Sequence, residues 1–319
     1  MTDLGESWVN SPVERWATIL LKSGILFVLG GFAAWTWDNN WQPLYDFTQW
    51  LNDGKDNKAV PTLFYLFGLL VIMATASSIL KHFDLVILRL LEGYYWPQWL
   101  RNWRVRRRNV WFERQNQRLQ ELVLKPHLPP EESAELARLD EQLMSMPTKL
   151  DLRMPTDLGD LLRMVELRPE QKYGLDAFKC WPRLWLVLPT EVKRELANAR
   201  DKLDSMVRIW SWSLLFMVWS IWAWWILILG GVALFVTYFW ILQAAKVYGQ
   251  LLESSFDLYR HLLYKELRWP LPKSPAEEKV QGEQLTAYLW RGSEQDTPKF
   301  INSFSTTDQG TERMDCEEF

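Results

Sequence analysis

A run of thirty-seven residues, from Ile209 to Ala245, contains no charged side chain. The hydrocarbon core of a bilayer is about 30 Å thick and is crossed by roughly 20 helical residues. The run is therefore too long for one comfortable span and close to the length of two short ones. A soluble core helix has no need for so much continuous apolar surface. The sequence predicts an integral membrane protein, and the folding of this run decides where the C-terminal part lies.

The rest of the chain is too polar to consist of membrane spans alone, with a mean hydropathy of −0.18 and a net charge of −3 over 319 residues. The 21 tryptophans suit a membrane protein because indole rings settle at the level of the lipid headgroups. Cys180 and Cys316 fit neither a disulfide framework nor a zinc spacing. They predict reduced thiols facing a cytoplasm. The acidic opening of the chain lacks the layout of a cleavable signal peptide.

Two further apolar segments predict a first transmembrane hairpin. After an N-terminal segment of residues 1–15, the spans cover 16–37 and 60–80, and the loop 38–59 between them holds four acids against two lysines. Between residues 81 and 125 the balance reverses to ten Lys and Arg against four acids. The positive-inside rule places the loop outside and the basic segment in the cytoplasm. Lys22, about two turns into the first span, is expected to extend to the headgroups.

The same rule decides how the uncharged run folds. A single span would carry five basic residues to the outer side: Lys246, Arg260, Lys265, Arg268 and Lys273. Residues 206–246 therefore predict a second transmembrane hairpin with its turn around Ser220 to Trp225. The expected fold is all-α, with four transmembrane helices and both termini in the cytoplasm.

Three segments are expected on the cytoplasmic side. Residues 81–205 form a helical domain, and residues 247–273 form an amphipathic helix packed against it. The tail 274–319, with ten acids against four bases, is expected to be mostly disordered.

Arginine and tryptophan interleave just after the second span. Trp99, Trp103, Arg106 and Val110 share one face at helical spacing. Such a helix can bind single-stranded RNA or lie along an anionic membrane surface. Its position after a span favours the membrane and makes nucleic acid the weaker alternative. The candidate membrane-surface residues are Trp99, Trp103, Arg104, Arg106, Arg107, Arg108 and Trp111. A proline-rich turn, KPHLPPEE, then leads to a second short helix, and the pair is expected to form a helical hairpin.

A second set of candidates surrounds the segment from Pro155 to Pro189, where Thr156 or Asp157 is expected to cap a helix. Its charged residues can line a binding pocket for a ligand or partner, or form ion pairs that fix a tight turn, and the second interpretation is favoured. A pairing of Asp257 with Arg163 is one specific hypothesis. The full set is Arg163, Glu166, Arg168, Asp176, Arg183, Asp257 and Arg260.

Short sequence motifs in the second half of the chain resemble those of a family of bacterial integral membrane proteins to which no biochemical activity is assigned. The N-terminal matches are Pro155, Thr156, Leu158, Gly159, Leu162, Arg163, Glu166, Tyr173-Gly174-Leu175-Asp176-Ala177 and Trp181-Pro182-Arg183-Leu184. The C-terminal matches are Tyr248-Gly249, Phe256-Asp257, Tyr259-Arg260 and Trp269-Pro270-Leu271-Pro272. The resemblance covers roughly the second half of the chain. It implies a bacterial inner-membrane protein but no reaction.

Three classes of function remain to be weighed. His82, His127 and His261 are scattered without metal spacing, and no nucleophile motif is present, so the sequence predicts neither an enzyme nor a bound cofactor or metal. An anchor or scaffold whose cytoplasmic domain recruits a protein partner is the preferred function. The alternative is an oligomeric pore or channel-like effector, gated by a cytoplasmic ligand or partner. A homo-oligomer is expected, because small glycines in the spans allow helices to approach closely.

Overall fold

The computed structural model describes residues 23–39, 82–147, 149–292 and 297–301, with residues 41, 42, 45, 48, 49 and 68 as single positions. Within this part of the chain all regular structure is helical, which confirms the all-α prediction. One described helix, Trp225–Glu266, is long and apolar enough to cross a membrane, against the four spans expected. The predicted span 60–80, apart from residue 68, and residues 16–22 of the first span lie outside the described residues.

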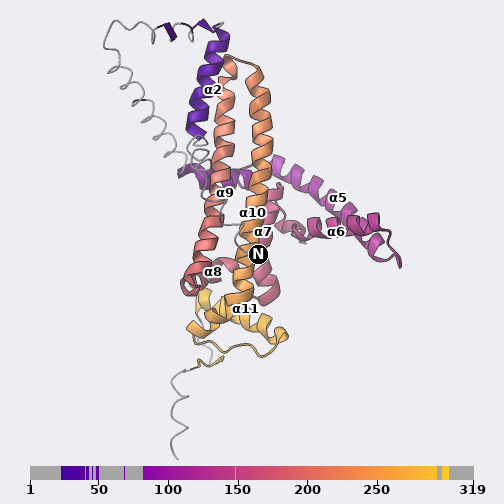
Figure 1. The fold of residues 1–319 in the computed structure, drawn as a ribbon. Helices are drawn as coiled ribbons and strands as arrows, with labels where there is room; N and C mark the ends of the chain where they lie inside the picture. The colour runs from indigo at the N-terminus through magenta and orange to yellow at the C-terminus, as the bar shows by residue number, and fades with distance from the viewer. Residues whose placement is uncertain are drawn as a thin grey trace, which may run out of the picture. The chain divides into compact units, whose positions relative to one another are not determined.

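The chain divides into two compact units (Figure 1). The first unit consists of residues 1–97 and 201–244, and the second of residues 98–200 and 245–319. Two long helices, α9 (Thr190–Phe216) and α10 (Trp225–Glu266), contribute one part to each unit.

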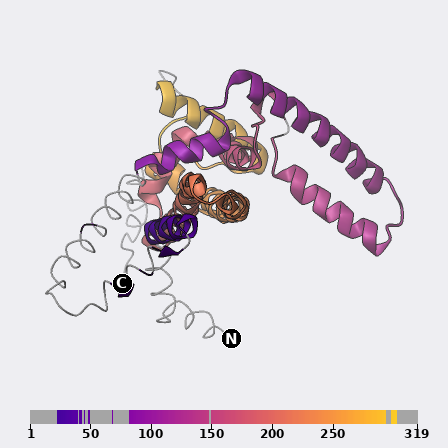
Figure 2. The ribbon, with the colours of Figure 1, turned by 90° about the horizontal axis from the view of Figure 1, so that it is seen from above.

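In the first unit, α2 (Ser23–Asp38) lies beside the second half of α9 and the first half of α10 (Figures 1 and 2). Glycines make this approach possible. A Cβ on Gly31 would lie 2.5 Å from the Trp219 ring, and Gly230 likewise lets α10 pass Met217 of the turn, where a Cβ would lie 2.6 Å away. Small residues at helix contacts are typical of packing in membranes, because they let helix backbones come close together.

The uncharged run folds back on itself within this unit. α9 ends at Phe216, a 3₁₀ turn covers Met217–Ile221, and α10 begins at Trp225. The reversal therefore overlaps the segment predicted for it, around Ser220 to Trp225, and begins three residues earlier. Arg208, on the polar side of the run, forms an ion pair with Asp84 at 3.1 Å, which joins α9 to the helical residues 82–92.

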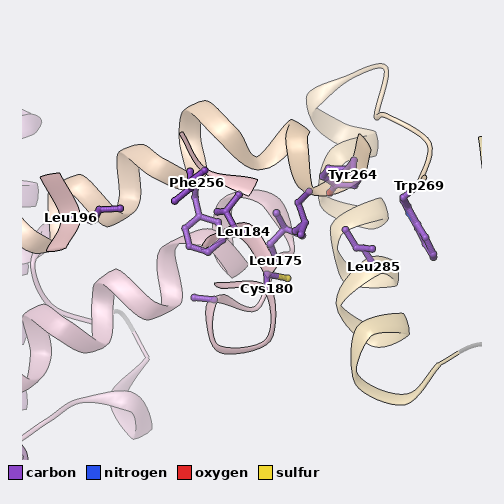
Figure 3. Packing of buried hydrophobic residues seen from close by; sticks show 11 residues of the cluster. Leu175, Cys180, Leu184, Leu196, Phe256, Tyr264, Trp269 and Leu285 are labelled. Atoms are coloured by element: carbon purple, nitrogen blue, oxygen red, sulfur yellow. The ribbon is translucent and has the colours of Figure 1, made fainter. Parts of the chain in front are cut away.

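The second unit is built around a buried cluster to which four helices contribute and against which a fifth, α7, packs through Tyr173 (Figure 3). These are α7 (Asp157–Tyr173), α8 (Ala177–Val187), the first turns of α9, the second half of α10, and α11 (Pro275–Arg291). Leu175, Leu184, Phe256, Tyr264 and Leu285 are all fully buried in this cluster. α5 (Gln98–Val123) and α6 (Pro130–Met144) form the expected helical hairpin in the same unit (Figure 2).

The ends of α7 and α8 follow from local chemistry. The Thr156 hydroxyl accepts a hydrogen bond from the Gly159 amide, as predicted, and caps α7. α7 ends at Gly174, whose φ of 69° is the left-handed conformation that glycine adopts most easily. Asp176 then caps α8 by accepting from the Lys179 amide. A short 3₁₀ turn, Leu150–Leu152, precedes this pair of helices.

Two of the predicted boundaries are wrong. Residues 247–266 are not a separate amphipathic helix, because α10 runs without interruption from Trp225 to Glu266. Apolar composition ends near Ala245, but composition does not end a helix. α10 contains no proline. Gly249 lies where α10 passes close to Val165, so a small residue suits this position.

The prediction of a mostly disordered tail is wrong for residues 275–291, which form α11. Ser274 caps the helix by accepting from the Glu277 amide. Leu285 is fully buried, and Tyr288 lies against Trp269 with ring centroids 5.1 Å apart. The acidic composition of the tail concealed a helix that packs against the core through Leu285, Tyr288 and Leu289. Residues 302–319 lie outside the described part of the chain.

Candidate partner-binding and membrane-surface sites

The structure separates the predicted charged set into three places. Arg163 and Glu166 form an exposed ion pair at 3.0 Å, one turn apart on α7. Asp176 pairs with Lys179 at 2.7 Å at the start of α8. Arg183 donates to the Lys179 carbonyl one turn further on. Both of these groupings are local to one helix and stabilise it modestly.

The remaining three residues, Arg168, Asp257 and Arg260, meet in one network that joins α7, α10 and α11. The carboxylate of Glu253 accepts hydrogen bonds from Arg168 and, at 2.7 Å, from Lys172. The Tyr173 hydroxyl donates to Asp257 at 2.6 Å, and Lys172 lies 3.5 Å from the same carboxylate. The members of this interhelical network are Arg168, Lys172, Tyr173, Glu253, Asp257, Arg260 and Glu278.

Arg260 extends the network to α11. Its guanidinium donates to Glu278 at 2.6 Å and lies over the Tyr173 ring, 4.0 Å from the centroid. Asp257 and Arg260 thus contact the Pro155–Pro189 segment, as expected, but through Lys172 and Tyr173. The specific pairing of Asp257 with Arg163 is wrong, because Arg163 is paired with Glu166.

Sequence reasoning missed Lys172, Glu253 and Glu278. Helical spacing carried a signal for the first two, since Lys172 lies four residues after Arg168, and Glu253 lies four residues before Asp257. Residues four apart lie on one face of a helix, so each pair presents like charges to the facing helix. Glu278 had no such signal because its helix was expected to be disordered.

The electrostatics of this network and of the neighbouring Cys180 follow from burial and hydrogen bonding. Burial tends to raise the pKa of Glu253, but hydrogen bonds from Lys172 and Arg168 outweigh it and the net shift is downward. Burial, followed by the hydrogen bond to Asp257, raises the pKa of Tyr173 to about 12. Burial also raises the pKa of the Cys180 thiol to about 11. At neutral pH Glu253 is therefore ionised, and Tyr173 and Cys180 keep their protons. None of the three is poised for proton transfer or nucleophilic attack.

A groove of about 200 Å³ lies beside this network, between α6, α7 and α10. Its apolar lining includes Met144, Leu161, Met164 and Val165. Charged residues border it, with Arg168 bound to Glu253 on one side and Lys246 paired with Glu141 at 3.3 Å on another. The remaining lining residues are Ser145, Gly249 and Gln250. An apolar side chain of a partner fits such a groove, and the charged border would set its orientation.

The membrane-surface candidates all lie on α5, but on opposite faces of it. Arg108 points into the unit, where it binds Asp160 at 2.6 Å and Asp157 at 2.5 Å. Asp160 is 1% exposed and also accepts from the Met154 amide at 2.7 Å. Burial alone would lower the pKa of Arg108, but the two carboxylates outweigh it and raise that pKa. Arg108 is therefore an internal anchor of α5 and not a membrane-surface residue.

A second arginine, not among the candidates, completes this anchor. Arg153 is 2% exposed, donates to the Pro147 carbonyl and to the Asn109 side chain at 2.9 Å each, and lies 3.7 Å from the centroid of the Phe112 ring. Arg104 is half-buried. The outward positions are held by Trp99, Trp103, Arg106, Arg107 and Trp111, all of them exposed.

Comparison with protein-family models, curated proteins and solved structures finds no match to this chain. The resemblance read from the motif words therefore stays a prediction. In the described part of the chain, no group of three or more His, Cys, Asp and Glu side chains is arranged to hold a metal ion. The function is therefore inferred from the geometry of the groove and of the α5 surface.

Proposed function

We propose that this chain is a multi-pass integral membrane protein whose second unit recruits a protein partner through the groove between α6, α7 and α10. In this proposal the first unit spans the bilayer, with α2, the second half of α9 and the first half of α10 as three of four spans. The segment 60–80 supplies the fourth span. Both termini lie in the cytoplasm, and the bilayer is a bacterial inner membrane, as the motif resemblance implies.

One observation carries the membrane part of the proposal, namely the apolar surface that the first half of α10 leaves exposed. Ile228, Val232, Phe235 and Phe239 are each more than half exposed, and 22% of the apolar window of this helix is buried. Large contiguous apolar surfaces are rare on soluble monomers. Lipid tails would cover this surface at no cost in unsatisfied polar groups, because the backbone of a helix bonds to itself.

The tryptophans of the first unit support the topology. Trp37, near the end of α2, lies 6.4 Å from Trp225 at the start of α10, and 6.2 Å from Trp41. Trp219 stacks on Trp222 at 5.2 Å within the turn. The end of α2 and the turn of the hairpin thus share one aromatic belt, as helix ends at a single membrane interface do. This supports one shared interface for the end of α2 and the hairpin turn, and the charge bias makes that interface the outer one.

The scaffold function is supported by how the second unit is built. Its interhelical network neutralises its own charges and holds no ionised group ready for chemistry, while the neighbouring groove leaves an apolar lining open. Within the described residues of the first unit, three hydroxyl groups do not support the pore alternative. Thr36, Ser211 and Thr237 are buried, and each hydroxyl donates to a carbonyl of its own helix.

The test uses the full chain in the membranes of cells that express it, with a photo-crosslinking side chain at Gln250, an exposed residue of the groove lining. We expect one discrete adduct with a protein other than this chain. Met144→Glu places a carboxylate beside the apolar lining and should reduce the adduct about tenfold, as the loss of one well-packed interface contact does. The protein should stay in the membrane after alkaline extraction.

The same probe at Glu191, an exposed residue in the first turn of α9, is the matched control and should give no such adduct. Adducts formed only between copies of this chain, together with ion conductance of the purified protein in planar bilayers, would replace the scaffold by the oligomeric pore. Release of the protein by alkaline extraction would contradict the membrane part itself.

A further inference from the structure

The outward face of α5 is the most unusual exposed surface of the second unit. It consists of Trp99, Trp103, Arg106, Arg107, Val110, Trp111 and Arg114, and we call it the α5 outer face. Trp99 is 72% exposed, Trp103 51% and Val110 49%. The last six residues of the set line a shallow hollow on the helix surface. Exposure of indole rings to water costs free energy. A helix face that presents three of them is therefore expected to bind a ligand or a membrane.

The charges on this face are available for a ligand. Arg106, Arg107 and Arg114 form no ion pair with any described residue, whereas Arg108 and Arg153 on the opposite side are bound to internal partners. The Arg107 guanidinium lies 5.5 Å from the centroid of the Trp103 ring, which holds it over the hollow. Three guanidiniums among indole rings match a ligand that has phosphates beside apolar or ring surface.

The position of α5 in the chain distinguishes between the two ligands of that kind. Pro97 ends the first unit and α5 begins at Gln98, so Trp99 follows the first unit directly. Tyr94 and Tyr95 just before it are exposed, and the Arg89 guanidinium lies 4.7 Å from the Tyr94 ring centroid. Tyrosine and tryptophan on either side of a junction with a membrane unit are typical of the headgroup layer. Single-stranded RNA needs no such junction.

We propose that the α5 outer face binds the phosphate headgroups of anionic lipids on the cytoplasmic surface of the bilayer. This inference rests on the proposed membrane location of the first unit. Trp99, Trp103 and Trp111 enter the headgroup layer, while Arg106, Arg107 and Arg114 bind lipid phosphates. Arg108 and Arg153 fix the roll of the helix, because their internal partners leave only this face free to turn toward lipid.

The experiment reads α5 alone, because 21 tryptophans make intrinsic fluorescence useless for one helix. Val110→Cys, in a chain whose Cys180 and Cys316 are replaced by alanine and serine, carries an environment-sensitive nitrobenzoxadiazole label. The full chain is reconstituted in vesicles of phosphatidylcholine, with or without phosphatidylglycerol. We expect a blue shift and quenching by brominated lipid in the anionic vesicles, both reduced by high salt.

Replacement of Arg106, Arg107 and Arg114 by glutamine should lower the ratio of docked to undocked α5 by roughly a hundredfold. Each cation near an anionic surface contributes about 1 kcal/mol of binding free energy, and three are removed. The charge-matched control replaces three exposed basic residues elsewhere in the second unit, Arg138, Lys149 and Arg194, and should leave the blue shift unchanged.

Two failures of this experiment have different meanings. Protein that does not float with the vesicles contradicts the membrane location itself. Protein that floats but shows the same label spectrum in neutral and anionic vesicles overturns the lipid proposal alone. A blue shift produced in detergent by single-stranded RNA, and absent with anionic lipid, would assign the α5 outer face to nucleic acid.

Discussion

At the scale of single residues, the run Arg106-Arg107-Arg108 shows how one residue type acquires opposite roles. Successive residues of a helix are separated by about 100°, so three adjacent arginines cannot share one face. Arg106 and Arg107 are exposed on the α5 outer face, while Arg108 is turned toward Asp157 and Asp160. The sequence indicated a basic segment but not this division, because the two carboxylates that bind Arg108 lie about fifty residues further along the chain.

Asp160 is the residue on which the attachment of α5 depends most. Asp160→Asn should lower the free energy of unfolding by about 3 kcal/mol. The substitution removes the buried negative charge that balances the Arg108 guanidinium and leaves only the exposed Asp157 carboxylate beside it. Asp157→Asn is the matched control. The Asp157 side chain is 63% exposed, so its loss should cost less than about 1 kcal/mol. Thermal unfolding of the detergent-solubilised protein measures both. Equal effects of the two substitutions would contradict the role of Asp160.

Glu253 makes the interhelical network sensitive to acid. Its pKa in the folded protein is lower than the ordinary 4.5, so its stabilising contribution is complete above that pH and is lost as pH falls through the folded-state pKa. Glu253→Gln should lower stability at neutral pH by about 1 kcal/mol and flatten the decline below about pH 4.5. Melting temperatures measured from neutral to acid pH test this. Glu195→Gln, at an exposed position, should keep the steep acid limb of the unchanged protein.

At the scale of elements, α11 shows what composition conceals. The segment has the composition of an acidic tail, yet two of its apolar residues contact partners that lie elsewhere in the chain. Leu285 enters the core, and Tyr288 lies between Trp269 and Phe300, 5.1 Å and 6.1 Å from their ring centroids. The Ser-Pro-x-Glu pattern at Ser274 is typical of a helix N-terminus, but the helix is stabilised by a docking surface that only the fold creates.

The docking of α11 rests on one close crossing of backbones. A Cβ on Gly282 would lie under 3.0 Å from the Tyr173 carbonyl oxygen, which belongs to the backbone and cannot turn away. Gly282→Ala should therefore displace α11 at a cost of about 2 kcal/mol, the usual size of an overpacking penalty. Hydrogen exchange of residues 275–291 should accelerate. Gly231→Ala is the control for replacing a helical glycine by alanine, because the added Cβ would meet no atom within 4 Å. Unchanged protection in Gly282→Ala would refute the crossing.

At the scale of the whole molecule, local signals predicted the elements and failed on their grouping. The all-helical class, the reversal near Ser220 and the cap at Thr156 followed from periodicity, proline and capping chemistry. The partners of Arg168 and Asp257 did not, because each lies on another helix about eighty residues away. The boundary near Ala245 also failed, since a helix can pass from an apolar to a polar sequence without a break.

The proposed topology of the second hairpin predicts on which side of the membrane two exposed residues lie. If both halves of the uncharged run cross the bilayer, Ile221 in the turn lies outside and Gln284 on α11 lies inside. Single cysteines at these exposed positions, in a chain without Cys180 and Cys316, separate the alternatives. A membrane-impermeant maleimide added to intact cells should label Ile221→Cys, and Gln284→Cys only after permeabilisation. The physical reason is that a single span would leave Lys246, Arg260 and three further basic residues on the outer side, against the bias that orients membrane proteins. Rapid labelling of Gln284→Cys in intact cells would contradict the hairpin and, with it, the cytoplasmic location of the groove.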